Sequence, residues 1–144
     1  MIGPVAALSP VSQGIYAALN VSALTGLLAG GVHDDVPQAP SYPFVQYEVQ
    51  LERDLGGFGT KALPQLEIRV HVFSQYAGWQ EAETILAAAE TLLHHETPAV
   101  TGYATWYCRA QVERPAVKLD DQELNGVKVK ELVGFFDLYV ESTS

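Results

Sequence analysis

The sequence is poor in cysteine, in basic residues and in long apolar runs. Its one cysteine, Cys108, has no second thiol with which to form an internal disulfide, so nothing indicates an oxidising compartment. Eight Lys and Arg against seventeen Asp and Glu give a formal net charge of -9, which disfavours tight binding to a phosphate backbone. No stretch approaches the roughly 18 apolar residues of a membrane-spanning helix, and residues 1–8 lack the basic start of a signal peptide. We therefore expect neither secretion nor a membrane partner, and a cytoplasmic location by default.

The length and the apolar spacing predict one domain, spanning 1–144, with two helices. A chain of 144 residues that is 48% hydrophobic has the size of a single globular core. Apolar residues recur at three- and four-residue steps from Ser9-Pro10, a favourable helix start, to Gly30, with an interruption near residue 20. The same spacing predicts a second helix over residues 78–95, whose last residues, His94 and His95, suit the helix dipole.

Strict alternation of apolar and polar residues predicts four strands, over residues 44–52, 66–72, 101–113 and 127–140. In the third, Trp106 shares the apolar parity of Cys108. The apolar parity changes along the fourth, which predicts a bulge at Gly134. Residues 114–126 are predicted to form a polar loop and turn. The order α-β-β-α-β-β predicts an α+β fold, with a mainly antiparallel four-stranded sheet and two helices on one face.

No pattern in the sequence indicates catalysis, a cofactor or a metal. His33, Asp34 and Asp35 are adjacent, so in an extended segment they point in opposite directions, and a solvated turn is favoured over a metal or acid-base site. Cys108 on an apolar parity predicts a buried, inert thiol. The glycines of residues 54–61 are followed by no Lys-Ser or Lys-Thr pair, so a flexible hairpin tip is favoured over a phosphate loop. We therefore predict no catalytic, cofactor-binding or metal-binding residue, and no enzyme.

Aromatic residues and long loops predict contacts with other proteins. Tyrosine is favoured where one side of a ring is packed and the other is wet, and a sheet of four long strands leaves edges that must be covered. The predicted contact residues are drawn from the glycine-rich tip, the start of the second helix and the loop before the last strand: Gly57, Phe58, Tyr76, Trp79, Lys118, Asp120 and Asp121.

The order of elements and several short segments match a known family. The segments are GIYAAL at 14–19, VHDDVP at 32–37, APSYPFV at 39–45, IRVHVFS at 68–74 leading into GWQEA at 78–82, and FDLYV at 136–140. On these residues, and over nearly the whole chain, the sequence resembles the small tail-completion, or tail-terminator, proteins of long-tailed bacteriophages.

The resemblance implies a structural virion part without catalysis or cofactors. It implies a homo-oligomer, a hexameric ring on the head-proximal end of the tail tube, which stops tube growth and joins the tail to the head connector. The partners would be the tail-tube protein and the head-connector protein, and the site of assembly the host cytoplasm. DNA would pass through without specific binding, because acidic walls repel phosphates.

Three other functions remain open at this point. A head-tail adaptor or another minor tail protein would share this size, acidity and layout. A small-molecule enzyme would need a pocket lined by Tyr47, His71, Trp106 and Arg109, yet no nucleophile-base pair can be named among them. An intracellular binding module would be a monomer without affinity for tail-tube protein.

Overall fold

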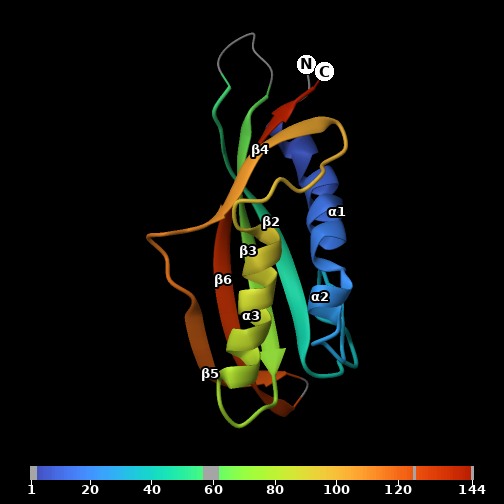
Figure 1. The fold of residues 1–144 in the computed structure, drawn as a ribbon, viewed down its shortest axis with the longest axis vertical. Coiled ribbons are helices and arrows are strands. Elements are labelled where there is room, and N and C mark those ends of the chain that lie inside the picture. Colours follow the sequence, from blue (N-terminus) through green and yellow to red (C-terminus); the bar gives the residue numbers. More distant parts are fainter. Residues whose placement is uncertain (1–2, 57–61, 125, 144) are drawn as a thin grey trace.

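The computed structural model describes residues 3–56, 62–124 and 126–143, which form one sheet and a layer of helices. In chain order, the elements are a 3-10 turn at Pro4–Ala7, α1 (Leu8–Leu19), α2 (Ser22–Thr25), β1 (Val32–His33), β2 (Phe44–Asp54), β3 (Pro64–Ser74), α3 (Gln80–Leu93), β4 (Tyr103–Ala110), β5 (Val117–Leu124) and β6 (Val127–Ser142). Figure 1 shows α1, α2 and α3 on the same side of the sheet. No helix in the described part of the chain has the length and apolarity to cross a bilayer.

The prediction of a four-stranded antiparallel sheet with two helices is wrong. Within the described residues the sheet is mixed and has six strands in the order β1-β2-β3-β6-β4, with β5 also paired to β6, and there are three α-helices. β1 is parallel to β2, and its two residues are too few to produce an alternation in the sequence. β5 falls in the predicted loop because its charged run, Lys118 to Glu123, has low strand propensity.

The strand that the loop prediction missed forms a hairpin with β6. Leu124 pairs with Val127 across two residues, of which Gly126 has a φ of 80°. A positive φ at this position is what a two-residue hairpin turn requires, and glycine adopts it without strain. The turn predicted within residues 114–126 therefore exists at Gly126, but it joins two strands.

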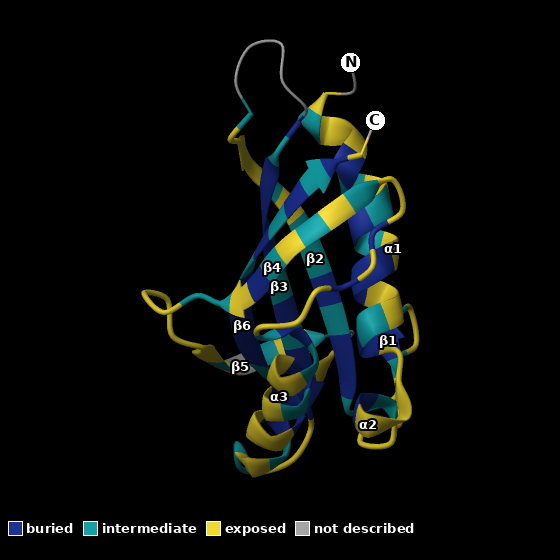
Figure 2. Cartoon of the chain, turned by 45° about the horizontal axis from the view of Figure 1, so that its top comes forward, coloured by how far each residue is buried: buried dark blue, intermediate teal, exposed yellow. Residues whose placement is uncertain are grey.

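The main core lies between the sheet and the helices. Leu66, Ile68 and Val70 of β3 are fully buried beneath α1 and α3, and the dark strands of Figure 2 mark this layer. The buried stripe of α3 consists of Ala82, Ile85, Leu86, Ala89 and Leu93, while Leu92, which the helical spacing also assigns to this stripe, is half-buried. Gly134 of β6 lies directly under Leu86, because a Cβ there would stand 2.8 Å from Leu86 Cδ1.

The predicted bulge at Gly134 does not exist. β3 and β6 pair without a register shift from Gln65 opposite Tyr139 to Ser74 opposite Lys130. The apolar parity changes because the sheet buries side chains on both faces. Phe136 belongs to the core under the helices, whereas Val129 packs with Phe44 and Phe73 in a small cluster of its own.

A bulge occurs in β4 instead, and it corrects the predicted place of Trp106. Thr105 pairs with Val140 and Tyr107 with Tyr139, so Trp106 is an extra residue in the strand. A bulge re-aims the side chain that it carries. Trp106 is 53% exposed, while Cys108, predicted on the same face, is fully buried. Burial raises the pKa of the Cys108 thiol to about 12, which disfavours the reactive thiolate.

The outer edge of β4 is covered by the segment that follows α3. The backbone N–H of His95 donates to Cys108 O at 2.7 Å, and Cys108 N–H donates to Glu96 O at 3.2 Å. His94 Nδ1 accepts from the backbone N–H of Ala110 at 2.9 Å. The two histidines therefore protect a sheet edge, in addition to ending α3.

Candidate assembly surfaces

A turn projects from the sheet where β4 ends and β5 begins. Both strands pair with β6, β4 along its C-terminal half and β5 along its N-terminal half, and residues 111–116 connect them (Figure 1). Gln111 N–H donates to Phe135 O at 2.9 Å, and Arg114 N–H to Gln111 O at 3.5 Å. We call residues 111–114 the edge turn. Its second residue, Val112, is 87% exposed, the most exposed of the large apolar side chains reported for the described residues.

The edge turn is held from below by a buried carboxylate. Glu67, in the middle of β3, is 2% exposed, and its oxygens lie 2.5 Å from an Arg114 Nη and 3.1 Å from Gln111 Nε2. Arg69 Nε donates to the same carboxylate at 2.8 Å. The Arg114 guanidinium also lies 3.8 Å from the centre of the Phe135 ring. One carboxylate thus fixes both ends of the turn by charge-assisted hydrogen bonds.

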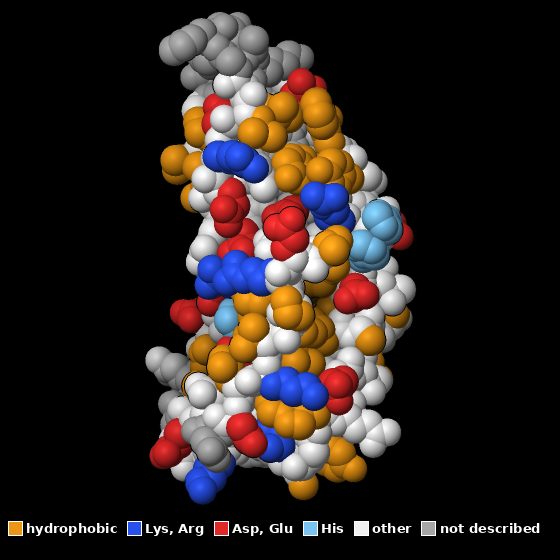
Figure 3. Space-filling view, turned by 90° about the vertical axis from the view of Figure 1, so that its left-hand side faces the viewer, with side chains coloured by type: hydrophobic (Ala, Val, Ile, Leu, Met, Phe, Trp, Pro, Cys, Tyr) orange, Lys and Arg blue, Asp and Glu red, His pale blue; other side chains and the backbone are white. Residues whose placement is uncertain are grey.

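A polar hollow of about 510 Å³ lies beside this network, on the sheet face away from the helices. Gln65 Oε1 accepts from Arg53 Nε at 2.6 Å, and Asp137 Oδ1 accepts from Gln111 Nε2 at 3.0 Å. Figure 3, which looks at the molecule from the side where the edge turn projects, shows basic, acidic and apolar side chains interspersed. The full lining is Glu52, Arg53, Gln65, Glu67, Arg109, Gln111, Val112, Glu113, Arg114, Asp137 and Tyr139.

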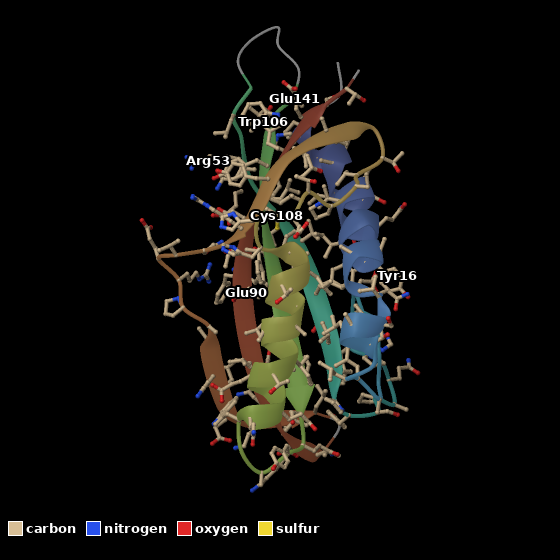
Figure 4. All side chains as sticks on the ribbon, in the orientation of Figure 1. Tyr16, Arg53, Glu90, Trp106, Cys108 and Glu141 are labelled. Carbon is tan, nitrogen blue, oxygen red and sulfur yellow. The ribbon has the colours of Figure 1, made fainter. Side chains whose placement is uncertain are left out.

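The pocket considered for an enzyme does not form. Of its four residues, only Arg109 lines the polar hollow. Tyr47 is buried under the helices, and Trp106 lies on the exposed bulge, near Glu141 in Figure 4. His71 lies between two carboxylates, 2.5 Å from Glu131 and 3.2 Å from Glu48. The four residues therefore lie in four different parts of the fold and do not share a pocket.

Burial raises the pKa of the Asp137 carboxyl, and the Gln111 hydrogen bond and nearby Arg109 only partly oppose this. The folded protein consequently binds a proton at Asp137 more tightly than the unfolded chain does. The contribution of this group to stability is present below the ordinary carboxyl pKa and is lost as pH rises through the raised value.

The Asp137→Asn variant should therefore be more stable than the parent protein near neutral pH, by less than about 1 kcal/mol because the carboxyl is partly exposed. Urea unfolding across a pH series measures this difference, which should vanish under acid conditions. Glu123→Gln, at an exposed carboxyl, is the control and should show no such trend. An Asp137→Asn profile parallel to the parent profile at every pH would contradict the assignment.

Part of the predicted contact set comes together at the opposite end of the edge. Trp79, at the start of α3, lies between two ammonium groups, with Lys118 Nζ 5.4 Å and Lys130 Nζ 5.1 Å from its ring. Lys130 Nζ also contacts Asp120 Oδ1 at 2.9 Å. Tyr76 is 52% exposed beside them.

The other predicted contact residues are Gly57, Phe58 and Asp121. Gly57 and Phe58 lie outside the described residues, and of Asp121 only the backbone, in β5, is described. A contact role for all seven residues stays a prediction.

The His33 cluster has local partners. His33 Nε2 lies 2.6 Å from Gly30 O, and Asp35 Oδ1 accepts from the Val36 N–H at 2.8 Å. Within the described residues, no group of three or more His, Cys, Asp or Glu side chains is arranged to hold a metal ion.

A groove that sequence reasoning missed lies at the other edge of the sheet. β1 pairs with β2 only at Val45 and Gln46. Above this point, α1 and β2 border two adjoining hollows of about 570 and 460 Å³. We call them together the edge groove. It is lined by Leu8, Ser9, Ser12, Gln13, Tyr16, Val32, His33, Asp34, Tyr47, Glu48, Val49 and Gln50. Neither a motif nor a periodicity marks it, because it arises from the difference in length between β1 and β2.

The fold is shared with solved structures. A chain of the virion of a native gene transfer agent particle superposes with a TM-score of 0.76 at 18% identity, covering 96% of this chain and 98% of that one. A second solved structure gives a TM-score of 0.50 at 14% identity, with 90% and 94% covered. A search of curated protein sequences finds no match.

A match to a protein-family model assigns the chain to a family. The model described as tail completion protein gp17 matches residues 13–129, which run from the middle of α1 to the start of β6 and include the edge turn and most of the lining of the edge groove. This match confirms the predicted resemblance and the prediction that the protein is structural and not an enzyme. The chain belongs to the tail completion protein gp17 family and is a structural bacteriophage tail protein.

Proposed function

We propose that this chain, acting as one domain over residues 1–144, is a tail terminator. Several copies, six by the resemblance, form a ring on the head-proximal end of the tail tube, stop its polymerisation and join it to the head connector. The family match over residues 13–129 carries the proposal, because completion of a tail requires a part that ends the tube. The protein would assemble in the host cytoplasm and remain in the virion.

The surface chemistry supports a ring subunit. The two outer strands of the sheet differ: one side presents the projecting edge turn and the other the edge groove. Unlike surfaces at opposite sides of one chain favour head-to-tail contacts, which close into a ring when the rotation between copies allows it. The net charge of -9 favours passage of DNA through such a ring without adhesion.

Light scattering at several concentrations, with and without the cognate tail-tube protein, tests the proposal. We expect a ring mass, about six-fold that of the 15.6 kDa chain, at least when tubes are present. A mixture of the tubes with an unrelated acidic protein of similar mass is the control. A monomer at every concentration that ignores the tubes would overturn the proposal. Binding to the head connector and not to tubes would favour the adaptor function.

A further inference from the structure

The outer edge of β2 borders the edge groove. Val45 N–H donates to Gly31 O at 3.0 Å, so the amide and carbonyl of Val45 point away from β3. Because this direction alternates along a strand, those of Tyr47, Val49 and Leu51 point the same way. Within the described residues, no strand pairs with this side of β2 beyond Gln46. An extended segment can add to such an edge by main-chain hydrogen bonds.

The edge turn lies on the side of the sheet opposite the edge groove and is preorganised for a contact. Its first and last residues are fixed to Glu67, which leaves Val112 and Glu113 at the tip. An exposed valine on a turn that is already fixed loses little conformational entropy on binding. In Figure 4, Tyr16, a residue of the edge groove, lies on the opposite side of the molecule from the segment that joins β4 to β5.

The strand register places the edge turn and the edge groove at the same level along the strand direction. Tyr47 pairs with Val70, and Val70 with Gly134. The edge turn leaves the sheet at this same point of β6, because Gln111 N–H bonds Phe135 O. In neighbouring copies related by a rotation about an axis along the strands, the turn of one copy therefore faces the groove of the next.

The strand directions are also compatible. β2 is antiparallel to β3, β3 to β6, and β6 to both β4 and β5. The outer edge of β4 is covered by residues 94–96, but β5, which continues from the turn, runs opposite to β2, and in such a ring the two meet in antiparallel fashion.

We propose that the edge turn of one copy docks into the edge groove of a second copy. Val112 enters the hollow between α1 and β1, and the backbone of the turn bonds to the outer edge of β2 near Tyr47. This inference rests on the ring of the proposed function, and names the contact that builds it.

Cross-linking tests the contact directly. A double variant, Gln13→Cys with Val112→Cys, should give covalent multimers longer than dimers on treatment with a short bismaleimide, in the presence of tail tubes. Cys108 is buried and does not interfere. Each single variant should give at most dimers. Glu90→Cys with Val112→Cys is the control pair, since Glu90 is exposed on α3 away from the groove (Figure 4), and should give no such ladder.

A charge in the turn provides a second test. Val112→Asp should abolish the ring mass, whereas Val127→Asp, at a valine that is 39% exposed, should preserve it. Circular dichroism should show both variants folded. Rings that survive Val112→Asp and give no cross-linked ladder would overturn this contact but not the terminator function. Absence of rings in the parent protein would overturn both.

Discussion

Replacing Glu67 by alanine is expected to lower the free energy of unfolding by about 2 kcal/mol, because charge-assisted hydrogen bonds contribute about 1.5–3 kcal/mol. The substitution removes the acceptor of Arg69, Arg114 and Gln111 from a site that is 2% exposed. Both guanidinium groups are partly exposed, at 30% and 45%, and water compensates part of the loss. This keeps the expected cost below that of an ion pair buried at both ends.

Urea unfolding measures the change, and hydrogen exchange at the Gln111 amide should show the edge turn loosened. Glu52→Ala is the matched control, because Glu52 lines the same hollow but is exposed. It should shift stability by no more than about 0.5 kcal/mol. Equal effects of the two substitutions would show that Glu67 does not anchor the turn.

Gly30→Ala is expected to destabilise the fold by about 3 kcal/mol, at the upper end of overpacking costs. A Cβ at this position would overlap Ser41 O and stand 2.8 Å from Phe44 Cβ. The neighbouring chain has little room to move, since Gly30 N–H donates to Pro43 O at 2.9 Å. Relief of the clash therefore requires displacing the start of β2, on which β1 and the lower end of the edge groove depend.

The midpoint of thermal unfolding reports this effect. Gly78→Ala is the control, because a Cβ there meets no atom within 4 Å and the backbone φ is not positive. The control should remain within about 0.5 kcal/mol of the parent protein. If Gly30→Ala has the same unfolding midpoint as the control, residues 30 and 41 do not lie as close together as described.

Long, regular elements could be predicted from the sequence. The predicted helix over residues 78–95 contains α3, and the predicted strands over 44–52 and 66–72 lie within β2 and β3. Their alternation is clear because one side of each element is buried in the main core. The interruption predicted near residue 20 of the first helix is the place where α1 ends and α2 follows after two residues.

The missed features lack such a signal. β5 pairs through its backbone while its side chains remain largely polar, so it has the composition of a loop. The bulge at Trp106 shifts a side chain without changing the apolar spacing of the sequence. Pairing with β6 determines both the β5 strand and the Trp106 bulge, and the sequence of one strand does not identify its partner strand.

The anchored turn was also beyond sequence reasoning. Glu67 and Arg114 are 47 positions apart, and each belongs to a segment whose charges suggest a solvated face. They meet because β4 and β5 share one edge of β6, a topology that the predicted four-stranded sheet did not contain. By contrast, the sequence pattern predicts contact residues near Trp79, and the β5–β6 hairpin brings Lys118 close to the Trp79 ring.

Tube growth in the presence of this protein is the most direct test of the terminator function. Tail-tube protein would be polymerised in vitro with increasing amounts of the chain, and tube lengths and ends would be examined by electron microscopy. A terminator should give shorter tubes as the ratio rises, each with a ring at one end only. Tubes of unchanged length, with bare ends at every ratio, would contradict it.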